Sequence, residues 1–295
     1  MTLIDTTREV TSALSHPAFN DEKSALLLEL LGRFRVQLVG IYVAPLIGPA
    51  WDSGGKCESD YMHHIEMVIS GRRQVVFNGE VMELLPGMTY FLPGNTPVER
   101  RWIEPCKVIF AKIRCECLPG IDPLLDWPHR APTLIGPVNE EICRHWLNPD
   151  STKAFSRLLE IRGLIESWMG RIFPGLEAII EKHLLGYAQF SKVLDLVEAN
   201  LGADLRIETL AKAQGVSRGS FTAAFLRSMG MSPKEHLKRR LNQSAIELLI
   251  NSDMRIKEIA EKLCFSDEFY FSRFFGKING LSPAKYRRRI RTGER

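Results

Sequence analysis

The sequence lacks three features that define special classes of protein. Its 6 cysteines form no Cys-x-x-Cys pair, which argues against a disulfide framework or a structural zinc site. Its longest uncharged stretch, residues 36–51, is too short to cross a bilayer and contains two prolines. No basic and then apolar leader opens the chain. We therefore expect a cytoplasmic protein without a membrane partner, and 295 residues suffice for two domains.

The positive charge is unevenly distributed. Residues 187–295 contain 20 Lys and Arg against 12 Asp and Glu, a net charge of +8. Residues 1–186 contain 19 against 23, a net charge of −4. A basic C-terminal third favours a polyanion as its partner, although a solvated helical surface would carry the same charge.

Residues 34–118 have the alternation and punctuation of β-strands. Short β-branched and aromatic runs are separated by Gly and Pro, and Asn78-Gly79 is a strong hairpin signal because a type I′ turn needs positive φ at both central residues. The runs predict strands over residues 34–43, 61–70, 73–77, 80–85, 88–92, 98–103 and 107–118. Seven such runs favour an antiparallel β-barrel or jelly roll. Residues 119–137 are Pro-rich and predicted to be irregular.

A helical pattern follows the predicted strands. Residues 153–173 place apolar side chains at helical spacing, with Arg and Glu between them. The apolar stripe comprises Phe155, Leu158, Leu159, Ile165, Trp168, Met169 and Ile172. It is either core or the surface through which a dimer forms, and both interpretations stay open.

The C-terminal third contains an internal repeat. Residues 204–217 align with residues 253–266 at an offset of 49, and after one inserted residue the offset becomes 50 through Pro233 and Pro283. Each unit predicts a short amphipathic helix, a tight turn and a second helix that begins behind a capping Ser. This is the pattern of a helix-turn-helix, present twice.

The spacing that the two units of the repeat share has a physical reason. Ala211 and Ala260 must be small because the second helix crosses closely above the first, and Gly215 suits a tight turn. Cys264 replaces that glycine in the second unit, so it must either avoid left-handed geometry or accept strain. Residues 232–251 predict one connecting helix of about 27 Å, which would place two recognition helices in successive major grooves about 34 Å apart.

Residues 256–288, IKEIAEKLCFSDEFYFSRFFGKINGLSPAKYRR, resemble the C-terminal signature of the AraC/XylS family of bacterial transcription regulators. The resemblance covers residues 187–290 and implies a seven-helix, two-headed DNA-binding domain. It also implies regulation of transcription, usually activation, with RNA polymerase and double-stranded DNA as partners. The fold class is then α+β and multidomain. We expect a cupin-like sensor domain over residues 1–135, a helical dimerisation and linker segment over 136–186, and the DNA-binding domain over 187–295.

The repeat places the candidate DNA contacts on two recognition helices, residues 218–228 and 267–277. Long polar side chains suit base edges or phosphates, and small or aromatic ones suit thymine methyl groups. The candidates are Arg218, Gly219, Ser220, Thr222, Ala223 and Arg227 in the first helix, and Glu268, Phe269, Ser272, Arg273 and Lys277 in the second. Lys285 and Arg287 are candidate phosphate contacts.

The same family resemblance implies a small-molecule effector, with a carbohydrate as one option, and a homodimer. Aromatic and polar side chains of the strand-rich half are candidate effector contacts. They are Trp51, Tyr61, His64, Tyr90 and Trp102. A regulator that dimerises without any ligand is a competing interpretation.

A metal-dependent cupin enzyme with a DNA-binding tail is the alternative from another class. Glu58, Asp60 and His64 stand where a metal cupin has its ligands, but Val98 stands at the position of the last histidine. No set of nucleophile, base and oxyanion donors is evident. The sequence therefore predicts no enzyme, no bound metal and no cofactor.

Overall fold

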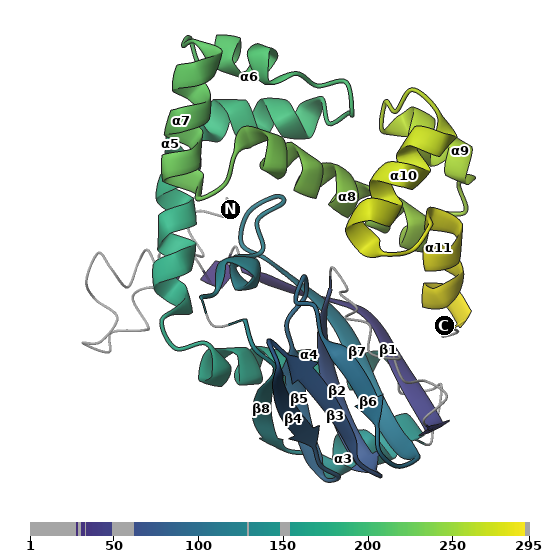
Figure 1. The fold of residues 1–295 in the computed structure, drawn as a ribbon. Coiled ribbons are helices and arrows are strands. Elements are labelled where there is room, and N and C mark those ends of the chain that lie inside the picture. Colours follow the sequence, from purple (N-terminus) through teal and green to yellow (C-terminus); the bar gives the residue numbers. More distant parts are fainter. Residues whose placement is uncertain are drawn as a thin grey trace, which may run out of the picture.

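The computed structural model describes residues 28, 31–32, 34–48, 62–128, 130–147 and 154–292. It consists of a sheet-rich N-terminal region and a helical C-terminal region (Figure 1). Both regions were predicted from the sequence. Trp51, Glu58, Asp60 and Tyr61 lie outside the described residues.

The strands of the N-terminal region form two antiparallel sheets. The larger has the order β1-β7-β2-β5-β8 and the smaller β4-β3-β6. Their bounds are β1 Arg35–Ile47, β2 His63–Ser70, β3 Arg73–Phe77, β4 Glu80–Leu84, β5 Met88–Leu92, β6 Glu99–Trp102, β7 Cys106–Glu116 and β8 Thr133–Pro137. We refer to this two-sheet unit as the sheet domain.

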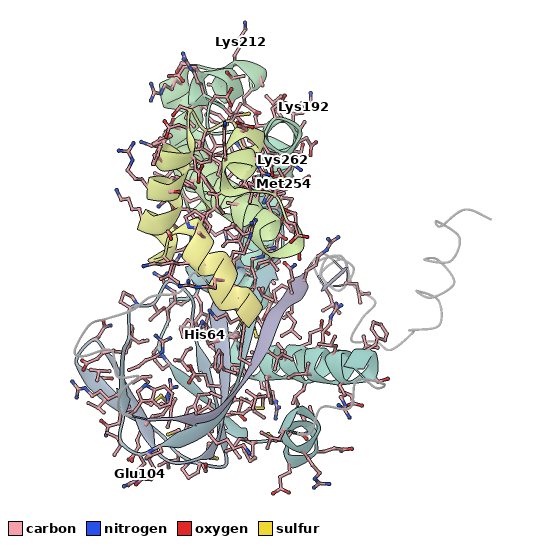
Figure 2. The ribbon with its side chains drawn as sticks, turned by 90° about the vertical axis from the view of Figure 1, so that its right-hand side faces the viewer. His64, Glu104, Lys192, Lys212, Met254 and Lys262 are labelled. Carbon is pink, nitrogen blue, oxygen red and sulfur yellow. The ribbon has the colours of Figure 1, made fainter. Side chains whose placement is uncertain are left out.

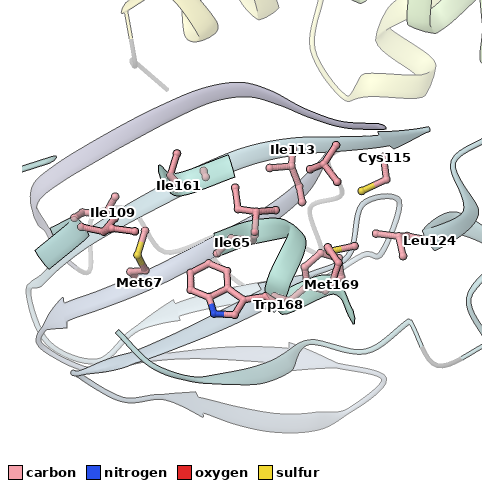
Figure 3. Close-up of a cluster of buried hydrophobic side chains, with 14 of the residues drawn as sticks. Ile65, Met67, Ile109, Ile113, Cys115, Leu124, Ile161, Trp168 and Met169 are labelled. Carbon is pink, nitrogen blue, oxygen red and sulfur yellow. The ribbon is translucent and has the colours of Figure 1, made fainter. Parts of the chain in front are cut away.

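The period-2 alternation of β2 and β7 gives the large sheet two different faces. Ile65 and Met67 of β2 join Ile109 and Ile113 of β7 in an apolar core that is closed by helix α4, Ala154–Ile172 (Figure 3). On the opposite face, Val68 joins side chains of the small sheet in a second cluster. The two sheets therefore pack face to face, and α4 covers the outer face of the larger one.

The structure confirms each predicted strand but only part of the predicted architecture. Asn78 and Gly79 have φ values of 50° and 83°, as the predicted turn requires. The strands of the described residues, however, form two open sheets, and they do not close into one barrel. The prediction for residues 119–137 was wrong, because they contain the 3-10 helix η3, Pro123–Asp126, and strand β8.

The remaining helices form the linker and the C-terminal region. Helix α5 continues across the predicted boundary at residues 186/187 and is kinked at Phe190. The bounds are α3 Glu140–Leu147, α5 Leu176–Ala199, α6 Ile207–Ala213, α7 Arg218–Met229, α8 Pro233–Asn251, α9 Ile256–Lys262, α10 Glu268–Asn279 and α11 Pro283–Thr292. No helix among the described residues is long and apolar enough to span a bilayer.

The C-terminal helices build two similar cores at the two ends of α8 (Figure 1). We call α6 and α7 the first head, and α9 and α10 the second head. Phe221 and Phe225 are buried in the first, and Phe271 and Phe275 in the second. The predicted connecting helix is confirmed, since α8 runs without a break for 19 residues.

Candidate nucleic-acid interface

The first head has the geometry that its sequence predicts. Ala211 is buried where α7 crosses α6, and Gly215 adopts φ 73° in the turn between them. Ser217 caps α7 by accepting a hydrogen bond from the amide of Ser220. Buried Phe221 and Phe225 fix one face of α7 to the core, so its opposite face remains exposed.

The second head repeats this geometry with two changes. Cys264 adopts φ 55°, so it accepts the left-handed conformation that Gly215 adopts without strain. The cap of α10 is Asp267, and the Ser266 hydroxyl donates to its carboxylate. The predicted Ser cap therefore belongs only to the first head. The hydrogen bond from the Tyr270 amide, and then that from Ser266, lower the pKa of Asp267.

The candidate contacts of the first head are displayed as predicted, but most are small. Arg218, Gly219, Ser220, Ala223 and Arg227 are exposed, and Thr222 is half-buried. Arg218 Nη1 lies 2.7 Å from Glu208 Oε1, so this guanidinium is already paired with an acid of α6.

The second head displays longer side chains. Glu268, Phe269, Arg273 and Lys277 are exposed and Ser272 is half-buried. The ring of Phe269 is 80% exposed. An exposed aromatic ring beside a guanidinium and an ammonium suits a thymine methyl group, a guanine edge and a phosphate.

The two candidate phosphate contacts differ. Lys285 is exposed in the first turn of α11. Arg287 turns inward and donates to the carbonyls of Leu249 and Met254, at 3.0 and 2.7 Å. Its guanidinium holds α11 against α8 and the loop before α9, which argues for a structural role.

Two exposed apolar side chains were missed by the sequence interpretation. Tyr270 is 47% exposed in the first turn of α10, and Leu226 is 49% exposed on α7. Tyr270 aligns with Ser220, which was a candidate, so the repeat itself contained the signal. Figure 2 shows Lys212 at the first head and Lys262 at the second, both far from His64 in the sheet domain.

The described effector candidates lie inside the sheet domain. His64, Tyr90 and Trp102 are all buried between the two sheets. The Trp102 ring is 4.3 Å from the guanidinium carbon of Arg73, whose Nη2 lies 2.6 Å from Glu66 Oε2. Burial lowers the pKa of Arg73, and the Glu66 carboxylate acts in the opposite direction. Trp102, Arg73 and Glu66 therefore contact one another in the interior of the sheet domain.

A cleft lies elsewhere in the described part of the chain. It has a volume of about 1470 Å³ and is lined by residues of β1, β7, α4 and α5 and by Glu247 of α8. Apolar side chains such as Phe34, Leu159 and Phe173 line it together with Arg35 and Arg114. Among the described residues, no three His, Cys, Asp or Glu side chains are grouped to hold a metal ion.

Comparisons with known proteins place the C-terminal region in a family. A family profile described as a helix-turn-helix domain matches residues 210–289. The MmsAB operon regulatory protein of Pseudomonas aeruginosa is 35% identical over 95 residues, which are 32% of this chain and 31% of that protein. The Msm operon regulatory protein of Streptococcus mutans is 27% identical over 158 residues, 48% of this chain and 57% of that protein. The chain thus spans between about a third and somewhat over half of these relatives.

A whole-chain likeness exists to ToxT of Vibrio cholerae, solved with a bound unsaturated fatty acid. The two chains are 15% identical with a TM-score of 0.46, over 86% of this chain and 95% of that chain. The paired helix-turn-helix units, and the profile that matches residues 210–289, support the resemblance of the C-terminal region to the AraC/XylS family.

Proposed function

We propose that the protein is a sequence-specific regulator of transcription, an activator that contacts duplex DNA through both heads. The observation that supports this most directly is the pair of exposed recognition faces, α7 and α10, at the two ends of one uninterrupted helix. Nineteen residues of α-helix span about 28 Å, close to the distance between successive major grooves on one side of B-DNA. Such a protein works in the cytoplasm, where we propose RNA polymerase as its partner.

Selection of bound duplexes from a random pool by the full chain tests the proposal. We expect two short motifs whose centres lie about 10 base pairs apart. Insertion of about 5 base pairs between them turns one motif to the opposite side of the duplex, so affinity should fall to that of one head. Recovery of a single motif, or of no motif, would contradict two-headed recognition.

We propose the sheet domain as the effector-sensing unit and as a variant of the cupin-like jelly roll. Two features support a ligand: the aromatic and charged interior that contains Trp102 and Arg73, and the cleft of about 1470 Å³. A carbohydrate suits the interior aromatics, whereas the cleft offers a mainly apolar wall. Tyr90 and Trp102 are 3% and 6% exposed, so a ligand in this interior would contact side chains that are shielded from solvent.

Thermal unfolding of the full chain with sugars, aromatic acids, fatty acids and divalent metals tests this proposal. A ligand at 100 times its Kd stabilises the folded state by about 2.7 kcal/mol. Stabilisation by one organic class would identify the effector class. Stabilisation by metals alone, lost with a chelator and with His64→Ala, would favour the metal-enzyme alternative. No stabilisation by any class would favour the regulator that needs no ligand.

We propose that the protein is a homodimer through the outer face of α4. The inner face of α4 is buried through Ile161, Ile165 and Trp168. On the outer face Phe155 and Leu159 are 73% and 52% exposed; both also line the cleft of about 1470 Å³, so a dimer through this face would cover the cleft. Arg162 and Glu166 pair on that outer face at 3.0 Å, and opposite charges on one face are self-complementary about a two-fold axis.

Phe155→Glu should convert a dimer to a monomer in sedimentation experiments. Val81→Glu is the matched control, because Val81 is 53% exposed on β4 in the small sheet. A dimer that survives Phe155→Glu, or that is lost equally in both variants, would refute this interface.

A further inference from the structure

One segment of the sheet domain is built into the cores of both heads. Residues 117–127, which we call the bridging segment, connect β7 to the loop before β8 and contain η3. Cys117, Leu118 and Ile121 are buried in the core of the first head, and Leu125 is buried in that of the second. Leu124 is buried in the core between the large sheet and α4. The segment therefore contacts three cores at once.

A buried carboxylate holds the bridging segment to the sheets. Asp122 Oδ2 lies 2.9 Å from His63 Nε2 and accepts from the amide of Cys115, while Oδ1 accepts from the amide of Leu124. The amide of Gly94 donates to His63 Nδ1 at 2.9 Å. Since Nδ1 is the acceptor, Nε2 carries the proton and donates it to Asp122. A shift of β2 or β7 must therefore move the segment.

A second set of polar contacts joins the segment to α8. Arg240 donates to Glu198 of α5 and, at 2.7 Å, to Gln243 of α8. Gln243 in turn donates to Glu116 at 3.0 Å, and the same Glu116 oxygen accepts from the amide of Gly120 at 2.9 Å. This chain of bonds runs from α5 through the middle of α8 to the sheet domain.

Gly120 is the position at which this contact is closest. Its φ of 74° is left-handed, and a Cβ added there would lie 2.1 Å from Cδ of Arg240. Such a Cβ would push the Arg240 side chain away from Glu198 and Gln243. The close approach of the segment to α8 therefore requires glycine at this position.

The loop before α6 also contacts the second head directly. The amide of Ala203 in this loop donates to the carbonyl of Leu263 at 2.8 Å, and Leu201 and Ala203 pack against the core of the second head. This bond and α8 lie within the DNA-binding region, whereas the bridging segment comes from the sheet domain. The segment thus braces the heads from outside their own sequence.

We propose that the bridging segment fixes the placement of the two heads relative to each other, and so determines which spacing between two DNA motifs the protein accepts. Gly120 and Gln243 are positioning residues in this scheme. The inference rests on the proposed two-headed recognition of DNA. It gives the sheet domain a direct mechanical route to both heads, because any ligand that shifts β2 or β7 moves the segment.

The effect of the bridging segment on the placement of the two heads can be measured without DNA, as the distance between two spin labels. Spin labels are attached to Cys264 of the second head and to Lys212→Cys of the first, in a chain with Cys57→Ser. Burial raises the pKa of Cys117 to about 12 and that of Cys115 well above its ordinary value, so these thiols resist labelling at neutral pH. The parent chain should give one narrow distance distribution.

Gly120→Ala should broaden or shift that distribution, and Gly79→Ala is the matched control. Gly79 has φ 83°, but no atom lies within 4 Å of an added Cβ, so the control has the backbone strain without the collision. If Gly120→Ala fails to fold, Gln243→Ala removes the link to Glu116 with no new atoms. An unchanged distribution in the folded variant would overturn the proposal.

The spacing preference provides the second readout. On a duplex selected by the parent chain, insertion of 1 base pair between the motifs should lower affinity by about tenfold for the parent and for Gly79→Ala. For Gly120→Ala the loss should shrink to about twofold. If Gly120→Ala still loses about tenfold in affinity on this insertion, the bridging segment does not fix the placement of the heads. If the parent chain selects no paired motif, the proposed function fails, while the label distances still test the brace.

Discussion

The two heads have the same buried scaffold, but the side chains on their exposed faces differ. Four buried phenylalanines occupy equivalent positions in α7 and α10, and Gly230 and Gly280 end the two helices with the same φ of 71°. On the exposed faces, Gly219 aligns with Phe269 and Ala223 with Arg273. The buried positions of the repeat are thus held in common, while its exposed positions differ in size and charge.

This difference indicates a division of labour between the heads. A helix with Gly and Ala at its exposed positions lets the backbone approach the groove closely and contributes shape and methyl contacts. A helix with Phe, Arg and Lys contributes directed contacts with bases and phosphates. We expect the second head to carry most of the base discrimination and the first to align the protein on the duplex.

The largest expected effects test the shared scaffold. Phe225→Ala and Phe275→Ala should each lower the free energy of unfolding by about 3–5 kcal/mol, because both rings are completely enclosed by their cores. Urea unfolding followed by circular dichroism measures both. Leu226→Ala is the surface control and should change stability by less than about 0.5 kcal/mol. A loss confined to one head would show that the scaffolds differ in packing.

The next expected effect is a loss of stability at acidic pH. His236 and Tyr286 are equivalent, and their rings pack against Phe225 and Phe275 at 5.8 and 5.1 Å. Burial, followed by the charges of Arg240 and Arg239, lowers the pKa of His236 to about 3. The unfolded chain binds this proton at about pH 6.5, so the contribution of neutral His236 is complete above that pH and is lost as pH falls toward 3.

We therefore expect acid to weaken the first head through His236. Between about pH 7 and pH 4 the loss should be about 3 kcal/mol, and His236→Phe should abolish that part of the pH dependence. Urea unfolding at several pH values checks this. Equal acid sensitivity in the parent and in His236→Phe would show that other groups are responsible.

A smaller effect separates the recognition faces. Arg273→Ala should cost about 1–3 kcal/mol and relax preference at one base pair. Arg218→Ala should cost less than about 1 kcal/mol on all sequences, because its guanidinium is already paired with Glu208. Fluorescence anisotropy on duplexes with single base-pair changes measures both. Equal losses of Arg273→Ala on specific and random DNA would remove its assignment as a base contact.

The sequence predicted the heads well because their information is local. Helix caps, the turn between helices and the two phenylalanines four residues apart are all encoded within about 25 residues, and the repeat presents that code twice. Even Tyr270 was available from its alignment with Ser220. The inward contacts of Arg287, which remains a candidate phosphate contact, could not be predicted because its acceptors, Leu249 and Met254, lie more than 30 residues earlier in the chain.

The bridging segment illustrates what could not be predicted. Its prolines and Gly120 signal turns, so the stretch was expected to be irregular. Ile121 and Leu125 are nevertheless buried, and their partners are helices about 70 to 150 residues further along. For the effector residues, sequence identified aromatic side chains of the sheet domain, but it did not reveal that Tyr90 and Trp102 are buried.

The smallest expected effect tests the turns, where the heads differ by one residue. Cys264 has φ 55° and Gly215 has φ 73°, and a non-glycine residue in this region costs about 1–2 kcal/mol. Cys264→Gly should stabilise the second head by about 0.5–1 kcal/mol, since relief of strain exceeds the added freedom of the unfolded chain. Gly215→Ala should destabilise the first by about 1 kcal/mol, as no atom lies within 4 Å of its Cβ and only the backbone resists. Urea midpoints of the two variants should therefore move in opposite directions, and movement in the same direction would show that Cys264 contributes packing that outweighs its strained backbone.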